Sequence, residues 1–151
     1  MKLSEHLSLA EVIRSETAKR HGISNMPTEE HIANFKILAE NVFEKIRNNF
    51  RCPIHISSGY RSKELNALTP GASKTSDHCK GFAADIEING VANAELAEWI
   101  EANCDFKQLI LEFYTPGIPD SGWVHVSYNE NGNDKKVMTA MKENGKTVYK
   151  L

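Results

Sequence analysis

Apolar residues recur every three or four positions through the first fifty residues, which predicts helices with one buried face. From Ser8 to Arg20, a serine cap is followed three residues later by Glu11, a capping-box pattern that predicts a short helix ending at Gly22. A cap at Thr28 predicts a second, longer helix with a buried stripe, ended by Cys52-Pro53. The apolar residues of that stripe are Ile32, Phe35, Ile37, Leu38, Val42, Phe43, Ile46 and Phe50.

Beyond Pro53 the apolar residues alternate with polar ones, which is typical of strands. Strands are predicted around Ile54 and Ile56, over residues 83–88, and in QLILEFY and GWVHVSY, which the turn-forming TPGIPDS joins. In residues 83–88, Asp85 and Glu87 fall on the face opposite the apolar residues. A small hairpin is expected around Glu143-Asn144-Gly145.

Two shorter helices are expected between these strands. SGYRSKELNAL predicts one, and a cap at Asn93 predicts the other, through Leu96, Trp99 and Ile100. TPGASKTSDHCKG, rich in Gly, Pro, Ser and Thr, is predicted to be a loop. Because several connections are too short for parallel crossovers, we expect an α+β fold with a small, mainly antiparallel sheet and N-terminal helices packed on it.

Composition limits the class of protein. The 151 residues are enough for one domain, which we take to span 1–151, and 40% hydrophobic with 25% charged residues are ordinary for a globular protein. The net charge of −2 and the scattered Lys and Arg predict no nucleic-acid partner. The first twenty residues lack the apolar core of a secretory signal or membrane span, so we expect synthesis in the cytoplasm and no membrane insertion. Three widely spaced cysteines without a C-x-x-C pair predict free thiols.

The stretch SDHCKGFAAD places His78 seven residues before Asp85. A continuous helix would separate these residues by about 10 Å along its axis, too far for one metal ion, whereas a loop that feeds a strand can bring them together. Gly81 gives such a loop backbone freedom. His125, opposite in direction to Val124 and Val126 on its strand, is a candidate third ligand. From spacing alone, a metal site and an ordinary surface turn both remain open.

Three motifs together carry a family resemblance. They are SGYRS, which ends at Ser62, then S-x-H-x-x-G-x-A-x-D from Ser76 to Asp85, and WVH, which ends at His125. In this order they resemble the zinc D-alanyl-D-alanine metallopeptidase family, which includes D-Ala-D-Ala carboxypeptidases and phage L-alanyl-D-glutamate endopeptidase lysins and shares its fold with hedgehog signalling domains. The resemblance covers residues 54–128, and LSEHLSLAEVIRSETA also looks like the opening of short phage-borne members.

The resemblance implies roles for particular residues. His78, Asp85 and His125 would bind Zn²⁺, which lowers the pKa of a bound water to about 7. Arg61 matches the family's arginine, which can hold a peptide carbonyl or an oxyanion. Ser76 would bind substrate or a ligand, and Gln108 is a further candidate substrate contact.

The general base is not given by the motifs. Many relatives carry an acidic residue three positions before the last histidine, where this chain has Gly122. Glu112 is the leading candidate, because Gln108, Ile110 and Glu112 share one strand face beside the strand of His125. Asp120 and Glu87 are alternatives.

The expected function is therefore zinc-dependent hydrolysis of peptidoglycan stem peptides, by a D,D-carboxypeptidase or an endopeptidase. We expect a phage-encoded, monomeric lysin that reaches the wall after release, or a virion-associated protein. Two alternatives remain: a non-catalytic, zinc-containing structural or wall-binding module, and a zinc-free domain with a degenerate site.

Overall fold

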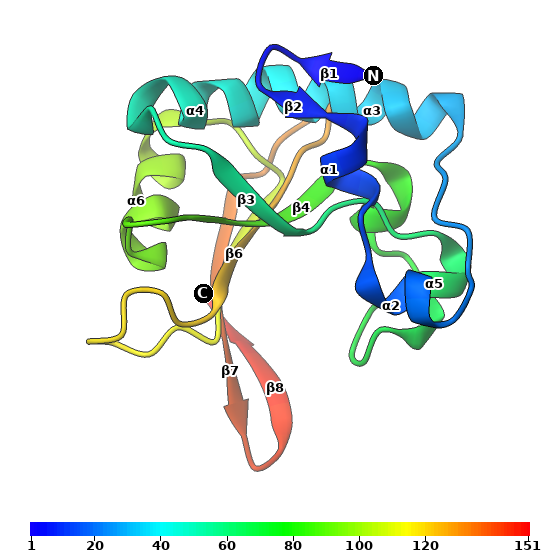
Figure 1. Cartoon of the computed structure of the whole chain (residues 1–151). Helices are drawn as coiled ribbons and strands as arrows, with labels where there is room; N and C mark the ends of the chain where they lie inside the picture. The colour runs from blue at the N-terminus through cyan, green and yellow to red at the C-terminus, as the bar shows by residue number, and fades with distance from the viewer.

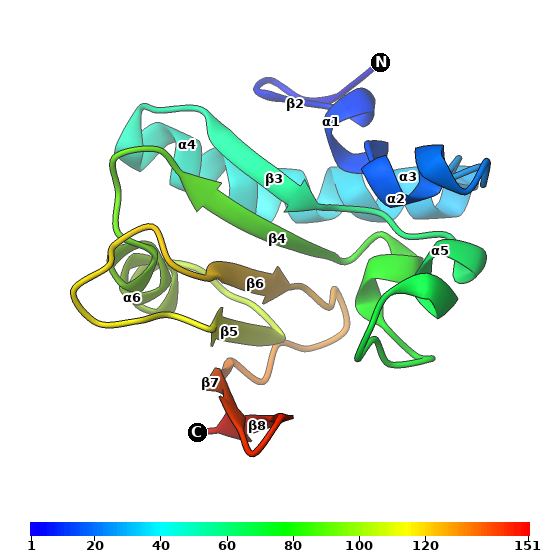
Figure 2. The same ribbon diagram turned by 60° about the horizontal axis from the view of Figure 1, so that its bottom comes forward.

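The computed structural model describes all residues from Met1 to Leu151 and shows an α+β fold built on a six-stranded sheet. The strand order is β3-β4-β6-β5-β7-β8, and four of the five strand pairs are antiparallel (Figures 1 and 2). The strand bounds are β3 Ile54–Ser58, β4 Ala83–Ile88, β5 Gln108–Glu112, β6 Trp123–Ser127, β7 Lys136–Glu143 and β8 Lys146–Lys150.

The pair β5 and β7 is parallel, with Glu112 opposite Ala140, so the sheet is mixed. The sequence did not predict this pairing. It arises because β6 returns antiparallel on one side of β5, and residues 128–135 then carry the chain to the other side of β5. The hairpin expected around Asn144-Gly145 is confirmed as the turn between β7 and β8, and both residues have the positive φ that this turn requires.

The N-terminal region differs from the single helix predicted for residues 8–20. Two helices form there, α1 (Leu9–Ile13) and α2 (Glu16–Arg20), because Arg14 is extended and Ser15 caps the second helix. The capping box of Ser8 and Glu11 is confirmed. A short two-stranded hairpin, β1 (Lys2–Ser4) and β2 (Leu7–Ser8), precedes α1 and was not predicted.

The long helix predicted to begin after Thr28 is confirmed. It consists of α3 (Glu29–Leu38), a π-helical segment η1 (Ala39–Phe43) and α4 (Glu44–Phe50), and the Thr28 side chain caps it. The expected shorter helices are α5 (Lys63–Leu68) and α6 (Asn93–Asn103), and the loop between α5 and β4 contains a 3₁₀ helix, η2 (Asp77–Lys80).

Asn93 does not cap α6, contrary to the prediction. It is the first helical residue, and Ala92 is the cap. The Asn93 side chain is almost fully buried and donates hydrogen bonds to the carbonyl oxygens of Ser121 and Gly122. The amide is therefore used to hold the loop before β6 instead of the helix terminus.

The hydrophobic core lies between one face of the sheet and the helices. Apolar residues of β3, β4, β5 and β6 pack there with α3, η1, α4 and α6 (Figure 2). The largest fully buried side chains are Phe35, Phe43, Phe106, Leu38, Ile46, Ile86, Leu96, Ile100 and Leu109. The opposite face carries Asp85, Glu112 and His125.

No helix of the structure combines the length and the apolar character needed to cross a membrane. The three cysteines are free thiols, as predicted.

Candidate metal centre

His78, Asp85 and His125 come together on the open face of the sheet. One nitrogen of each imidazole and one carboxylate oxygen all lie within 4.8 Å of one another. Asp85 Oδ1 is 3.4 Å from His78 Nε2 and 3.0 Å from His125 Nδ1. The two imidazole rings are 5.2 Å apart, centre to centre. The sequence-predicted ligands therefore form one cluster.

Strand register places two of these residues. Asp85 of β4 lies directly opposite His125 of β6 in an antiparallel pair, so both side chains leave the same face of the sheet. Apolar neighbours on both strands, including Ile86, Val124 and Val126, face the core and fix this orientation.

The third residue, His78, comes from η2, just before β4. Ser76 caps this helical turn by accepting a hydrogen bond from the His78 N–H, and Gly81 ends it in the left-handed conformation. A Cβ at Gly81 would lie 2.4 Å from the carbonyl oxygen of His31, so only glycine lets the loop pass this close to α3. The absence of a side chain at position 81 thus allows the loop to pack closely against α3.

The imidazole of His78 is oriented by a backbone carbonyl on the side away from Asp85. Its Nδ1 lies 2.7 Å from the carbonyl oxygen of Gly59, which can only accept a hydrogen bond, so Nδ1 carries the proton. Nε2 is then left with its lone pair toward Asp85. A backbone carbonyl behind a histidine is the usual way in which a metal-binding imidazole is oriented.

The electrostatics of the cluster favour a cation. Burial would raise the pKa of Asp85, but His78 and His125 lower it well below the usual aspartate range, so the carboxylate is ionised. Burial lowers the pKa of His125, and Asp85 more than offsets this, so the net pKa is raised. The ionised carboxylate between the two imidazoles offers an anionic oxygen, one of the ligand types that zinc binds.

The two distances from Asp85 to the imidazole nitrogens are close to those of a tetrahedral zinc site. Ligand atoms about 2.1 Å from one ion lie about 3.4 Å from each other in tetrahedral geometry, close to the 3.0 and 3.4 Å found here. Two imidazoles and one carboxylate are also the ligand types of catalytic zinc sites, which leave one position open. These residues could therefore hold Zn²⁺ with room for a reacting group.

In a second cluster, Glu5, His6 and Glu44 also bring three potential ligand atoms within 4.8 Å of one another. Two of its residues are exposed, and the Glu44 carboxylate is already hydrogen-bonded to Ser4 and His6. It is explained by packing of the N-terminal hairpin.

Arg61 lies beside the buried cluster. Its backbone N–H donates to the carbonyl of His78, and its Nη2 donates to Ser76 Oγ, 3.3 Å away. Burial lowers the pKa of Arg61, while Asp85, Cys79 and Glu112 oppose this shift. The Nε atom of Arg61 is buried without a hydrogen-bond partner. Ser76 thus positions both the guanidinium and the turn of His78, and the guanidinium retains unused donor capacity.

Glu112 reaches the site from β5. It lies opposite Trp123 on β6, and the indole Nε1–H of Trp123 donates a hydrogen bond to Glu112 Oε2. Burial and the nearby Asp85 raise the pKa of Glu112, and His125, Trp123 and Arg61 partly oppose this. The prediction that β5 would set Glu112 near His125 agrees with this arrangement.

The other residues proposed from sequence lie around this centre. Gln108 is on the same strand face as Glu112, opposite Ser127, so the two residues flank the row of His125. Glu87 follows Asp85 on its face of β4 and accepts a weak hydrogen bond from Asn93, 3.4 Å away. Asp120 lies in the loop before β6.

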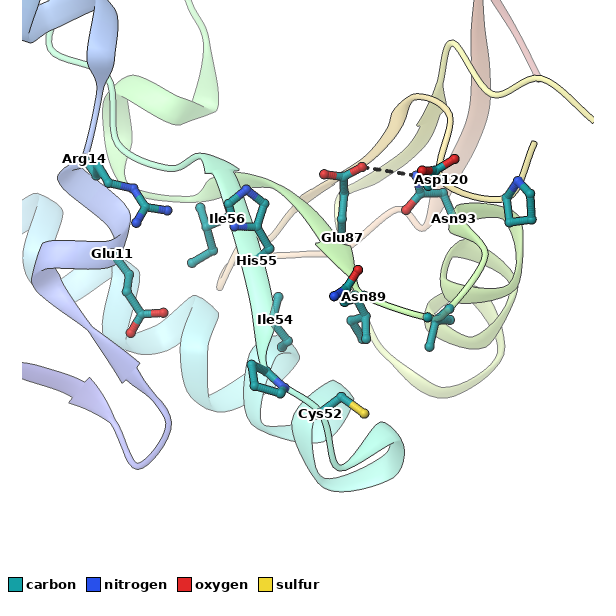
Figure 3. A pocket seen from close by; sticks show the side chains of 15 residues that line it. Glu11, Arg14, Cys52, Ile54, His55, Ile56, Glu87, Asn89, Asn93 and Asp120 are labelled. Carbon is teal, nitrogen blue, oxygen red and sulfur yellow. Dashed lines mark hydrogen bonds between the residues drawn. The ribbon is translucent and has the colours of Figure 1, made fainter.

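Glu87 and Asp120 line a pocket of about 1160 Å³ that none of the three candidate ligands lines (Figure 3). His55 and Glu87, which are opposite each other on β3 and β4, form part of its lining. Glu11 of α1 and Arg14, which follows α1, lie on one side, and Asn93 and Asp120 lie on the other. Glu87 is two residues from Asp85, or about 7 Å along the strand. Glu87 is therefore the residue of the pocket that lies nearest to Asp85 along β4.

Gly122 occupies the position where many relatives carry an acidic residue, and its surroundings explain the glycine. Its φ is +65°, and a Cβ there would lie 1.9 Å from the carbonyl oxygen of Glu112. No side chain fits while Glu112 keeps its place. The loop and β5 thus approach closely at the point where Glu112 enters the site.

Sequence reasoning missed two supporting residues, Gly59 and Trp123. The carbonyl of Gly59 orients His78, and the motif SGYRS contained it without indicating this contact. Trp123 is the first residue of the motif WVH, which indicates no role for it. The register of β5 against β6 is the signal that pairs it with Glu112.

A model of the family described as Peptidase M15 matches residues 5–127 of the chain. The matched segment contains the three candidate ligands, Arg61 and Glu112, and it ends at the last residue of β6. No curated protein matches the chain.

Proposed function

The chain belongs to the peptidase M15 family, and from this premise we propose that it is a zinc peptidase acting on the stem peptides of bacterial peptidoglycan. Membership supports a metallopeptidase. The observation that carries the proposal is the convergence of His78, Asp85 and His125 beside Arg61 and Glu112 on one open sheet face. A site built only for stability would more often use cysteines and be closed.

His78, Asp85 and His125 would hold the zinc ion. When bound, zinc would supply Lewis-acid polarisation of the scissile carbonyl and lower the pKa of a water molecule. The carbonyl of Gly59 keeps the proton of His78 on the nitrogen that faces away from the ion.

Glu112 is the proposed general base. Its carboxylate would accept a proton from the attacking water and deliver it to the leaving amine as the C–N bond breaks, which gives one carboxylate and one amine product. The hydrogen bond from Trp123 holds the carboxylate in place. A raised pKa brings this group closer to the working pH of a general base.

Arg61 is the proposed oxyanion-stabilising residue. A guanidinium that is partly buried, held by Ser76 and left with an unpaired Nε–H can donate to the oxygen on which negative charge develops. Because Ser76 is occupied by Arg61 and His78, its contribution to substrate binding is mainly indirect. Gln108 would contact the peptide on the other side of the His125 row.

The pocket beside Glu87 would take the part of the stem peptide that extends from the reacting bond. The proposal covers two reactions, which are removal of a terminal D-alanine and cleavage within the stem peptide. In either case the proposed protein is a phage-encoded monomer that meets the wall after release or as part of a virion.

Mass spectrometry of peptidoglycan fragments tests the function directly. Wall preparations of lysine and diaminopimelate types are incubated with zinc-loaded protein, and the released masses identify the bond that is cut. The expected result is a single class of cleavage that disappears with a chelator and in His125→Ala. Full digestion by His125→Ala would exclude the assigned site.

A second candidate function is a non-catalytic, zinc-containing wall-binding module, favoured by Gly122 at the position of the family's acidic residue. Such a module would retain zinc and bind the wall without releasing fragments. Its behaviour would not change when Glu112 is replaced, whereas an enzyme would lose its rate.

A further inference from the structure

The C-terminal hairpin brings a tyrosine to the row of residues that contains Glu112. Across the sheet, Trp123 pairs with Glu112, Glu112 with Ala140, and Ala140 with Tyr149. Residues that are directly paired point to the same face, so the side chain of Tyr149 emerges on the face of the metal centre. The hairpin of β7 and β8 lies outside the part of the chain that matches the family model.

The residue between Glu112 and Tyr149 leaves room for the ring. Ala140 is fully buried although it lies on the open face, and it has only a methyl side chain. Two strand spacings separate the backbones of Glu112 and Tyr149 by about 10 Å, a gap that the two side chains can largely span above an alanine. A bulky residue at position 140 would keep them apart.

Tyr149 remains accessible to a ligand. Its exposed fraction is 51%, so about half of the residue is open to solvent. Partial burial, Glu112 and Asp85 together raise its pKa, so the hydroxyl keeps its proton and is a hydrogen-bond donor at neutral pH. The charge of Asp85 on β4, which three strands separate from β8 in the sheet, is among those that affect it.

Two further aromatic side chains, Phe113 and Trp123, lie next to Glu112 in the chain or across the β5–β6 pair. The rings of Phe113 and Trp123 are 5.3 Å apart, and the ammonium group of Lys142 lies 6.0 Å from the Phe113 ring. Lys142 is two residues from Ala140 on the same face of β7. The hairpin therefore provides a partly apolar side to the site, with a hydroxyl at Tyr149.

We propose that Tyr149 is a substrate-contacting residue whose phenol hydroxyl donates a hydrogen bond to a main-chain carbonyl of the peptide bound beside Glu112. This inference rests on the proposed function. It assigns to the β7–β8 hairpin the role of a substrate-binding wall, on the side of the centre opposite the pocket beside Glu87. The contacted carbonyl is one residue or more from the reacting bond, because Tyr149 lies on the row of Glu112 and not on the row of His125.

The test compares Tyr149→Phe with Tyr128→Phe in the zinc-loaded, full-length protein. Tyr128 follows β6 and packs against the core, so its variant removes a hydroxyl away from the centre. The substrate is peptidoglycan solubilised with a muramidase. Because a contact to a distant carbonyl is made equally in the bound substrate and the transition state, KM should rise about tenfold in Tyr149→Phe while kcat stays within twofold. Tyr128→Phe should match the wild type, and zinc content should be unchanged in both variants.

Each outcome decides the inference. Wild-type values of both constants in Tyr149→Phe, or a fall in kcat with unchanged KM, overturn it and leave the proposed function standing. If the wild type does not hydrolyse the substrate, the proposed function fails. The inference is then tested by measuring the binding of the same muropeptides by calorimetry instead of the rate of hydrolysis. A tenfold weaker binding in Tyr149→Phe then still supports the contact, and equal or absent binding overturns it.

Discussion

The indole N–H of Trp123 donates a hydrogen bond to the carboxylate of Glu112 directly across the β5–β6 pair. This contact fixes the only carboxylate of β5 one row away from His125, on the side where Arg61 and Asp85 also act on it. A carboxylate so placed can serve a reaction at the metal centre without binding the metal. The relationship supports the proposal that Glu112 is the general base in a chain with glycine at position 122.

Replacement of Glu112 by Gln should separate metal binding from catalysis. Glutamine keeps the size of the side chain and can still accept from Trp123, but it cannot take a proton. We expect kcat to fall by about 10²- to 10⁴-fold, the usual contribution of a general base. Zinc content, measured by atomic emission, and the melting temperature should not fall. Glu87→Gln is the matched control and should retain most of the activity. If Glu87→Gln shows the large loss and Glu112→Gln does not, the base has been assigned to the wrong strand.

Replacement of Trp123 by Phe should move the pH profile. The indole hydrogen bond stabilises the charged carboxylate, so its loss raises the pKa of Glu112 further above the usual glutamate value. Since the base acts only when deprotonated, the acidic limb of kcat/KM should shift to higher pH. Trp99→Phe is the control, because Trp99 packs against Phe50 beneath the sheet. An acidic limb that stays in place, or that moves to lower pH, contradicts the role of the indole.

The sequence indicated three candidate ligands that cluster in the structure, whereas several of the elements around them were not predicted. The motif from Ser76 to Asp85 and the motif WVH named His78, Asp85 and His125 through the family resemblance, and the structure brings these side chains together. Strand alternation predicted the outward faces of Asp85 and His125, and the placement of Glu112 used the same alternation with one antiparallel neighbour.

The parts that failed depend on distant partners. Nothing in the period of residues 136–143 shows that β7 joins the far side of β5, so neither the parallel pair nor the position of Tyr149 could be derived. Asn93 has the side chain of a helix cap, but the loop carbonyls of Ser121 and Gly122 use its amide. The spacing of apolar residues also does not reveal the helix break at Arg14, because Ser15 can cap a helix or lie within one.

The metal centre should couple zinc binding to stability. Zinc at one hundred times its dissociation constant should raise the free energy of unfolding by about 2.7 kcal/mol, and a chelator should remove this gain. Asp85→Asn keeps the shape of the side chain but loses the charge between the imidazoles, so it should lose most of the zinc-dependent stabilisation in thermal melts. His21→Ala, at an exposed helix end, should behave as the wild type. A zinc-dependent stabilisation that persists in Asp85→Asn would place the ion elsewhere.

A side chain at Gly122 should damage both fold and activity. In Gly122→Ala the new Cβ would overlap the carbonyl of Glu112 and push β5 or the loop aside. Gly117→Ala is a close control, because Gly117 also has a positive φ, of +90°, but nothing lies within 4 Å of its Cβ position. Both variants should lose about 1–2 kcal/mol from backbone strain. Gly122→Ala should lose more in urea denaturation and should also lower kcat. Equal losses in the two variants would mean that the close approach has no energetic weight.

The N-terminal hairpin should make stability depend on pH through Glu44. This carboxylate accepts from Ser4 Oγ at 2.5 Å and from the His6 N–H at 3.0 Å. Burial would raise its pKa, but these hydrogen bonds and His6 lower the net value. Because the folded-state pKa is depressed, the stabilisation is present above the usual glutamate pKa and is lost as the pH falls through the folded value. Glu44→Gln should therefore cost about 1–2 kcal/mol in urea denaturation at neutral pH, and the difference from wild type should shrink on acidification below about pH 4. Glu143→Gln, which removes an exposed pair with Lys150, should cost less than about 0.5 kcal/mol at either pH. If the cost of Glu44→Gln is the same at both pH values, packing alone holds the hairpin, and the ionised carboxylate contributes nothing to it.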